Sequence, residues 1–169
     1  MPVSLCPLVS PDSCDDPPAP VRTADPTSLS YSFTIPGESR SAAVARRNVQ
    51  ASLCAHGLTG IAPPVLQVVG ELVACAVMFE PGQNLYLSLN WRDDALRTVL
   101  WDPHPSHRSE PAASLLCADR RRRMLLLLAC VARECGGDWG IDTPGPGAEG
   151  TKVWAVLPYT GAAAYARQG

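Results

Sequence analysis

The chain has 169 residues, of which 46% are apolar, 18% charged and 6% aromatic, and its formal net charge is −2. This length fits one domain with its own core, and the composition excludes a wholly disordered chain, a coiled coil and a collagen-like repeat. The small net charge gives no overall attraction to nucleic acid or anionic lipid. We therefore expect a globular domain that does not bind nucleic acid directly.

The first segment, 1–29, holds seven of the 17 prolines and shows no apolar period. We expect it to be a disordered tail, because it cannot bury enough surface to offset the entropy lost on ordering. It lacks a basic start followed by an apolar core, so we expect no signal peptide. The longest strongly apolar run, 124–132, is too short to span a membrane. The seven cysteines form no CxxC pair, which favours reduced thiols and a cytoplasmic protein.

From residue 30 to residue 102, apolar residues recur with the period of a strand or of a helix, and turn residues separate the segments. The clearest helix carries a stripe of valine, leucine and alanine from Val65 to Val77, followed by Pro81-Gly82. The predicted elements are a strand at 30–34, helices at 39–56 and 65–79, and a β-hairpin with strands at 84–91 and 95–101.

Beyond Asp102, the pattern predicts a loop at 103–113, a helix at 117–135, a strand at 138–142, a Gly/Pro loop at 144–150, and a last strand at 152–157 before a weakly patterned tail. The run Met124–Leu128 is too apolar for an exposed face, so we expect it in the core. The arginines Arg120–Arg123 would then lie near a helix N-terminus, where cations oppose the helix dipole. A bound phosphate or an acidic partner would offset that cost, whereas the alternative is a solvated basic run.

His104 and His107 have a spacing found in metal sites, but zinc requires three or four ligands. The nearest cysteine in sequence is Cys117, and the histidines lie in a proline-rich loop without a predicted geometry. The sequence alone therefore does not favour a metal site here.

Several segments, taken in order, resemble the ATP-binding domain shared by histidine kinases and the small actinobacterial serine/threonine kinases that act as anti-sigma factors. The matching segments are Arg46-Arg47, Glu71–Ala76 (ELVACA), the hairpin ending at Asp102, Arg121–Leu127, Gly136–Gly140 (GGDWG) and Gly150–Pro158. The resemblance covers about residues 30–160 and leaves tails at 1–29 and 161–169. It implies an α+β two-layer sandwich, with helices on one face of a mixed, mostly antiparallel sheet. It also implies ATP between the helices and a mobile lid at about 103–120.

The first family motif is E-L-V-x-N-A, in which the Glu polarises an attacking hydroxyl and the Asn ligates Mg²⁺. Glu71 matches the Glu, and a carboxylate suits the role of general base. Cys75 stands at the position of the Asn, and a thiol is a poor ligand for Mg²⁺, which prefers hard oxygen ligands. The resemblance therefore places a catalytic base here and puts the metal in doubt.

The other motifs concern the nucleotide itself. Asp102 matches the Asp that receives the adenine amino group, and Gly150 and Thr151 match the Gly-Thr of the adenine pocket. Arg121 and Arg123, before Met124, stand where the family has the glycines of its phosphate-binding G-x-G-[LM] turn. Glycine lets a backbone approach phosphate closely, and arginine can contact phosphate only through its guanidinium.

The resemblance implies an ATP-binding protein that phosphorylates an antagonist protein and sequesters a sigma factor. Its partners would be a sigma factor or an anti-anti-sigma-type protein, and it would dimerise through residues 30–56. The replaced metal ligand and glycines favour an alternative, a non-catalytic protein-binding module that keeps the fold without nucleotide turnover. From the residues alone, Glu71 is better explained as an exposed helix residue. Asp102 can also be the start of a turn, and Thr151 can equally be a strand residue.

Overall fold

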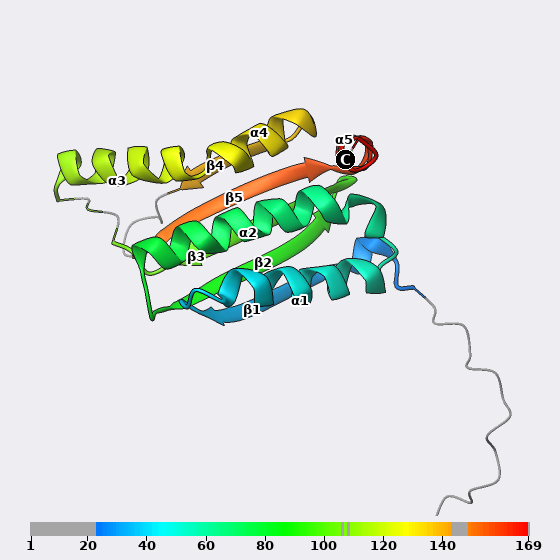
Figure 1. The fold of residues 1–169 in the computed structure, drawn as a ribbon, viewed down its shortest axis with the longest axis horizontal. Helices are drawn as coiled ribbons and strands as arrows, with labels where there is room; N and C mark the ends of the chain where they lie inside the picture. The colour runs from blue at the N-terminus through cyan, green and yellow to red at the C-terminus, as the bar shows by residue number, and fades with distance from the viewer. Residues whose placement is uncertain (1–22, 106, 108, 143–148, 169) are drawn as a thin grey trace, which may run out of the picture.

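The computed structural model describes residues 23–105, 107, 109–142 and 149–168, so most of the predicted tail and of the predicted Gly/Pro loop lie outside the described residues. Its described part is an α+β fold in which five helices pack against a five-stranded sheet (Figure 1). The strand order is β1-β2-β3-β5-β4. The strands are β1 (Ser30–Pro36), β2 (Asn84–Arg92), β3 (Ala95–Asp102), β4 (Asp138–Asp142) and β5 (Thr151–Pro158).

Every neighbouring pair of these strands is antiparallel, so the expectation of a mixed sheet is corrected for the described residues. The helices are α1 (Ser41–Ala55), α2 (Ala62–Phe79), α3 (Pro111–Met124), α4 (Leu126–Glu134) and α5 (Tyr159–Ala166), with short 3₁₀ turns η1 (Pro26–Ser28) and η2 (Thr59–Ile61). In Figure 1, α1 and α2 lie side by side in front of the sheet.

The core lies between the helices, with α2 contributing most of the buried helix residues, and the sheet face that they cover. Strand alternation turns Leu85, Leu87 and Leu89 of β2 toward the helices, where all three are buried. The predicted stripe of α2 is buried against that face, with Pro63 and Pro64 in the first turn, where the missing amide hydrogens cost nothing. The opposite sheet face carries partly or fully exposed side chains such as Ser32, Tyr86, Ser88, Arg97 and Trp101.

Among the described residues, the segment Thr59–Phe79 has the length and hydropathy that a bilayer crossing requires. In this fold, 56% of an apolar 18-residue stretch within this segment is buried inside the protein. A central core helix meets the same length and hydropathy criteria, so this finding is weak evidence for a membrane span.

Both boundaries of the expected domain shift outward. Leu29, which we placed in the tail, is 1% exposed, and the amide of Ala24 donates to the carbonyl oxygen of Ala55 at 2.8 Å. At the other end, α5 replaces part of the tail expected at 161–169 and packs against η2 and α2. Its small residues, including fully buried Ala162, carry too weak an apolar period to predict this helix.

The helix predicted at 117–135 is in fact two helices, α3 and α4, which meet at Leu125. The arginine run therefore lies in the last turn of α3 and not near a helix N-terminus, so three of its cations favour the helix dipole. The expected core position of Met124–Leu128 holds for Leu125 and Leu128, which are buried. It is wrong for Leu126, which is 64% exposed, and for Leu127.

Candidate functional site

Asp102 ends β3 on the face that the helices cover, and its side chain is fully buried. Its register partner on β5 is Thr151, which is 6% exposed. Two residues that the family resemblance would place in one adenine site are therefore neighbours across two strands. Both positions follow from period-two alternation, because Leu96, Thr98, Leu100 and Asp102 share one face of β3.

The carboxylate of Asp102 is bound by Arg121, one of the residues that we expected to contact phosphate. Nη1 of Arg121 donates to Oδ2 at 2.7 Å, and Nη2 donates to Oδ1 at 2.8 Å. The guanidinium also lies 3.9 Å from the centre of the Phe79 ring, at the end of α2. Arg121 is 1% exposed, so this is a buried, bidentate ion pair.

The rest of the Asp102 surroundings is also filled. The amide of His104 donates to Oδ1 of Asp102 at 3.1 Å, and the hydroxyl of Thr151 donates to the carbonyl oxygen of His104 at 3.2 Å. The cavity that remains beside Arg121 and Thr151 has a volume of about 40 Å³. Pockets that hold drug-sized ligands are about 300–1,000 Å³, so the cavity that the described residues form here is too small for a nucleotide base.

Cys75 lies on α2 next to this ion pair, and its thiol is buried. Burial raises the pKa of Cys75 to about 11, and the nearby Arg121 guanidinium only partly opposes that shift. The thiol is therefore protonated at neutral pH, and a protonated thiol is neither a nucleophile nor a metal ligand. Glu71 lies one turn earlier on the same helix and is partly exposed.

The remaining predicted residues are spread over different surroundings. Gly150 has φ +99° before β5, and a Cβ there would lie 2.5 Å from Nε1 of Trp101. Backbone conformation and packing therefore explain why position 150 is a glycine. Arg123 is exposed and pairs with Asp119 one turn away at 2.7 Å. Met124 ends α3 and packs partly buried against the core. Arg121 and Arg123 thus do not form a common phosphate-binding turn.

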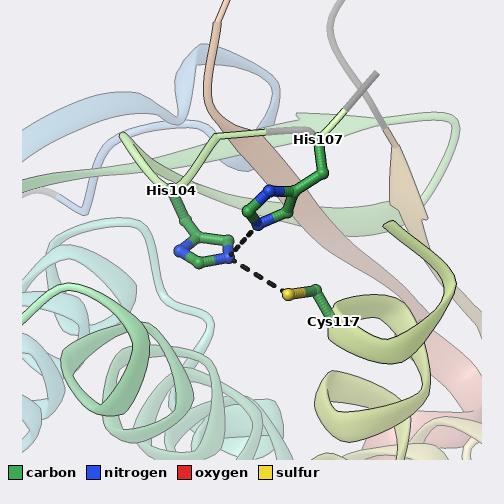
Figure 2. A group of neighbouring side chains, drawn as sticks. All are labelled: His104, His107 and Cys117. Atoms are coloured by element: carbon green, nitrogen blue, oxygen red, sulfur yellow. Dashed lines mark hydrogen bonds between the residues drawn. The ribbon is translucent and has the colours of Figure 1, made fainter. Parts of the chain in front are cut away.

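A second group of polar side chains borders the same cavity. His104 and His107, from the loop after β3, meet Cys117 of α3, and their ligand atoms point toward one another (Figure 2). Glu80, just after α2, binds the outer nitrogen of His104. The sequence pattern singles out His104 and His107 and names Cys117 as the nearest cysteine, but it does not favour a metal site. It does not identify Glu80, which lies 24 residues before His104. The helical spacing of Cys117 and Arg121, one turn apart, is the signal that one face of α3 is polar and inward.

The chain matches no protein-family model, and a comparison with curated proteins also finds no match.

Proposed function

We propose that this protein is a non-catalytic regulatory module that acts by binding another protein, and that it resembles the anti-sigma-factor kinases without turning over ATP. The observation that carries this proposal is the ion pair between Arg121 and Asp102. The carboxylate that would receive the adenine amino group already accepts two hydrogen bonds from a side chain of the same chain. Nucleotide binding would have to break this buried pair first.

The chemistry around the pair also favours a non-catalytic role. Cys75, at the position of the family's Mg²⁺-ligating Asn, keeps its proton at neutral pH because its burial raises the thiol pKa. The expected phosphate turn is replaced by the last turn of a continuous helix, α3, whose backbone N–H groups are used within the helix. Glu71 remains a carboxylate on α2, but it has no metal-bound phosphate to act upon in this proposal.

The surface of α3 and α4 supports protein binding. Leu115 and Leu116 are each 71% exposed on α3, and α4 exposes Leu126 and Leu127. The exposed arginines of α3, such as Arg122, add positive charge to the segment of chain between these two pairs of leucines. Exposed leucines bordered by arginine fit a partner with an acidic surface and apolar side chains. By the resemblance, this partner would be a sigma factor or an anti-anti-sigma-type protein.

A homodimer through residues 30–56 remains a prediction. In the fold, β1 is an edge strand, and a groove between β1 and α1 is lined by Tyr31, Phe33, Asn48 and Ala51. The rings of Tyr31 and Phe33 stack with an interplanar angle of 1°. An edge strand next to partly buried aromatic rings is compatible with pairing to a second copy.

One observation favours a second candidate function, ATP binding by a kinase of the anti-sigma type. Asp102 and Thr151 are register partners on the helix-facing side, where the resemblance would place adenine. In that case Arg121 would have to leave Asp102 when α3 moves, and Glu71 would act as the base that accepts the proton of a serine or threonine hydroxyl.

Titration of the full chain with ATP, with and without Mg²⁺, separates the two candidates. The non-catalytic module predicts no heat of binding up to millimolar ATP under either condition. A Mg²⁺-dependent micromolar affinity would overturn it and support the kinase. Protein binding is tested separately by the rate of association with sigma factors of the same genome. That rate should fall as salt rises, and should fall on Arg122→Ala but not on Arg97→Ala, an exposed arginine on the opposite sheet face.

A further inference from the structure

Three potential metal ligands meet beside the middle of α3, where Cys117 lies. Nε2 of His104 lies 3.3 Å from Nε2 of His107 and 3.4 Å from Sγ of Cys117, and all three atoms lie within 4.8 Å of one another (Figure 2). With Zn–N of about 2.0–2.1 Å and Zn–S of about 2.3 Å, tetrahedral coordination sets neighbouring ligand atoms about 3.3–3.6 Å apart. The two closest separations therefore match those around a single zinc ion.

Glu80 contacts His104 on the side that faces away from His107 and Cys117. Its Oε1 lies 2.8 Å from Nδ1 of His104, the ring nitrogen that faces away from the cluster. A carboxylate accepts and does not donate, so Nδ1 carries the proton, and Nε2 of a neutral His104 presents its lone pair to the cluster. A carboxylate that holds the outer nitrogen of a ligating histidine is the usual second contact of zinc-binding imidazoles.

With a neutral His104, hydrogen bonding within the cluster accounts for only one of the two contacts to Nε2. A neutral His104 has one lone pair on Nε2, yet both Nε2 of His107 and Sγ of Cys117 approach that atom. The lone pair can accept only one of these two contacts well. A cation at the centre accepts lone pairs from all three side chains at once, and the adjoining 40 Å³ cavity is large enough for a water as the fourth ligand.

We propose that His104, His107 and Cys117 bind a zinc-class divalent transition-metal ion, with Glu80 as the residue that positions His104. A thiolate and two imidazoles are suitable ligands for Zn²⁺ and poor ones for Mg²⁺ or Ca²⁺. The ion joins the loop after β3 to α3. Cys117 lies one turn before Arg121, so the ion holds the same helix face that carries the arginine to Asp102. This proposal does not depend on the proposed function.

The test uses the full chain, freed of metal with a chelator and kept reduced. Co²⁺ serves as the spectroscopic probe, because tetrahedral Co²⁺ with a thiolate ligand gives intense ligand-field bands and a sulfur-to-cobalt charge-transfer band. The expected result is one equivalent of bound Co²⁺ with both signals, and their loss when one equivalent of Zn²⁺ is added.

The variants locate the ion. Cys117→Ser should abolish the charge-transfer band and the stoichiometric binding, whereas Cys130→Ser, which removes an exposed thiol of α4, should leave both unchanged. His107→Ala should also abolish stoichiometric binding, and it keeps the test valid if Cys117→Ser fails to fold. Glu80→Ala should weaken Zn²⁺ binding about 10- to 100-fold while the Co²⁺ bands remain.

Two results would overturn the proposal. One is a wild-type chain that shows no tetrahedral Co²⁺ spectrum at micromolar metal. The other is a spectrum and stoichiometry that persist in both Cys117→Ser and His107→Ala, because the ion would then lie at other residues. Circular dichroism of each variant provides the check that the fold is intact.

Discussion

Asp102 and Thr151 face each other across β3 and β5, and each side chain is held by a group from outside the sheet. Asp102 binds the guanidinium of Arg121, and Thr151 donates to the carbonyl oxygen of His104. The two residues that would recognise adenine therefore have their polar atoms satisfied within the chain. This pairing is the basis for proposing a protein-binding role rather than nucleotide turnover.

The first prediction concerns the energetics of the Arg121–Asp102 pair. Arg121→Met leaves a buried carboxylate without its cation, which should lower the free energy of unfolding by about 3–5 kcal/mol in urea titrations. Replacing both partners, Arg121→Met with Asp102→Leu, should recover much of that loss, because no buried charge remains. Arg122→Met, at an exposed neighbouring position, should change stability by less than about 0.5 kcal/mol. Equal effects of Arg121→Met and Arg122→Met would show that the pair does not form.

The second prediction concerns pH. The folded-state pKa of Cys75 is raised by burial from 9.0 to about 11, so the folded state binds a proton that the unfolded state loses. Below pH 9, the free energy of unfolding carries the full contribution of this proton. As the pH rises through the window from 9 to 11, the free energy of unfolding falls by roughly 2–3 kcal/mol. Urea unfolding across this window should show the decrease in the wild type and a smaller decrease in Cys75→Ala. Parallel pH profiles of the two proteins would contradict the burial of this thiol.

The third prediction separates two reasons why position 150 requires a glycine, backbone conformation and packing against Trp101. Gly150 and Gly82 both have positive φ, +99° and +80°, but only Gly150 faces a neighbour that a Cβ would meet, the indole of Trp101. Gly82→Ala should cost about 1 kcal/mol through backbone strain alone. Gly150→Ala should cost more, by roughly 1–3 kcal/mol, because the ring must also move. Thermal unfolding measures both, and equal losses would contradict the packing explanation.

Part of this fold could be predicted from sequence because burial leaves a period in the chain. The alternating residues of β2 and β3 and the stripe of α2 face the core, and the structure confirms these elements close to their predicted bounds. The break at Leu125 could not be predicted, since no Gly or Pro marks it and the residues on both sides, Arg120–Met124 and Leu126–Leu128, are compatible with one helix.

The candidate site was less accessible to sequence reasoning for a related physical reason. Asp102 and Thr151 were identified by their motif positions, but what binds them depends on how α3 packs. A buried arginine and an exposed arginine look alike within the run Arg120–Arg123. Likewise, Glu80, His104 and Cys117 come together only because α2, the loop after β3 and α3 meet in space.

The most direct test of the central claim, that Arg121 closes the site on Asp102, is calorimetric titration of Mg²⁺–ATP into the wild type, Arg121→Ala and Arg122→Ala. The account predicts no binding up to millimolar ATP for the wild type and for Arg122→Ala. For Arg121→Ala it predicts measurable binding, with an affinity at least about tenfold above the millimolar limit set by the wild type. The reason is that Asp102 is then free to accept the adenine amino group. Micromolar binding by the wild type that Arg121→Ala does not improve would contradict the claim, and so would silence in all three proteins.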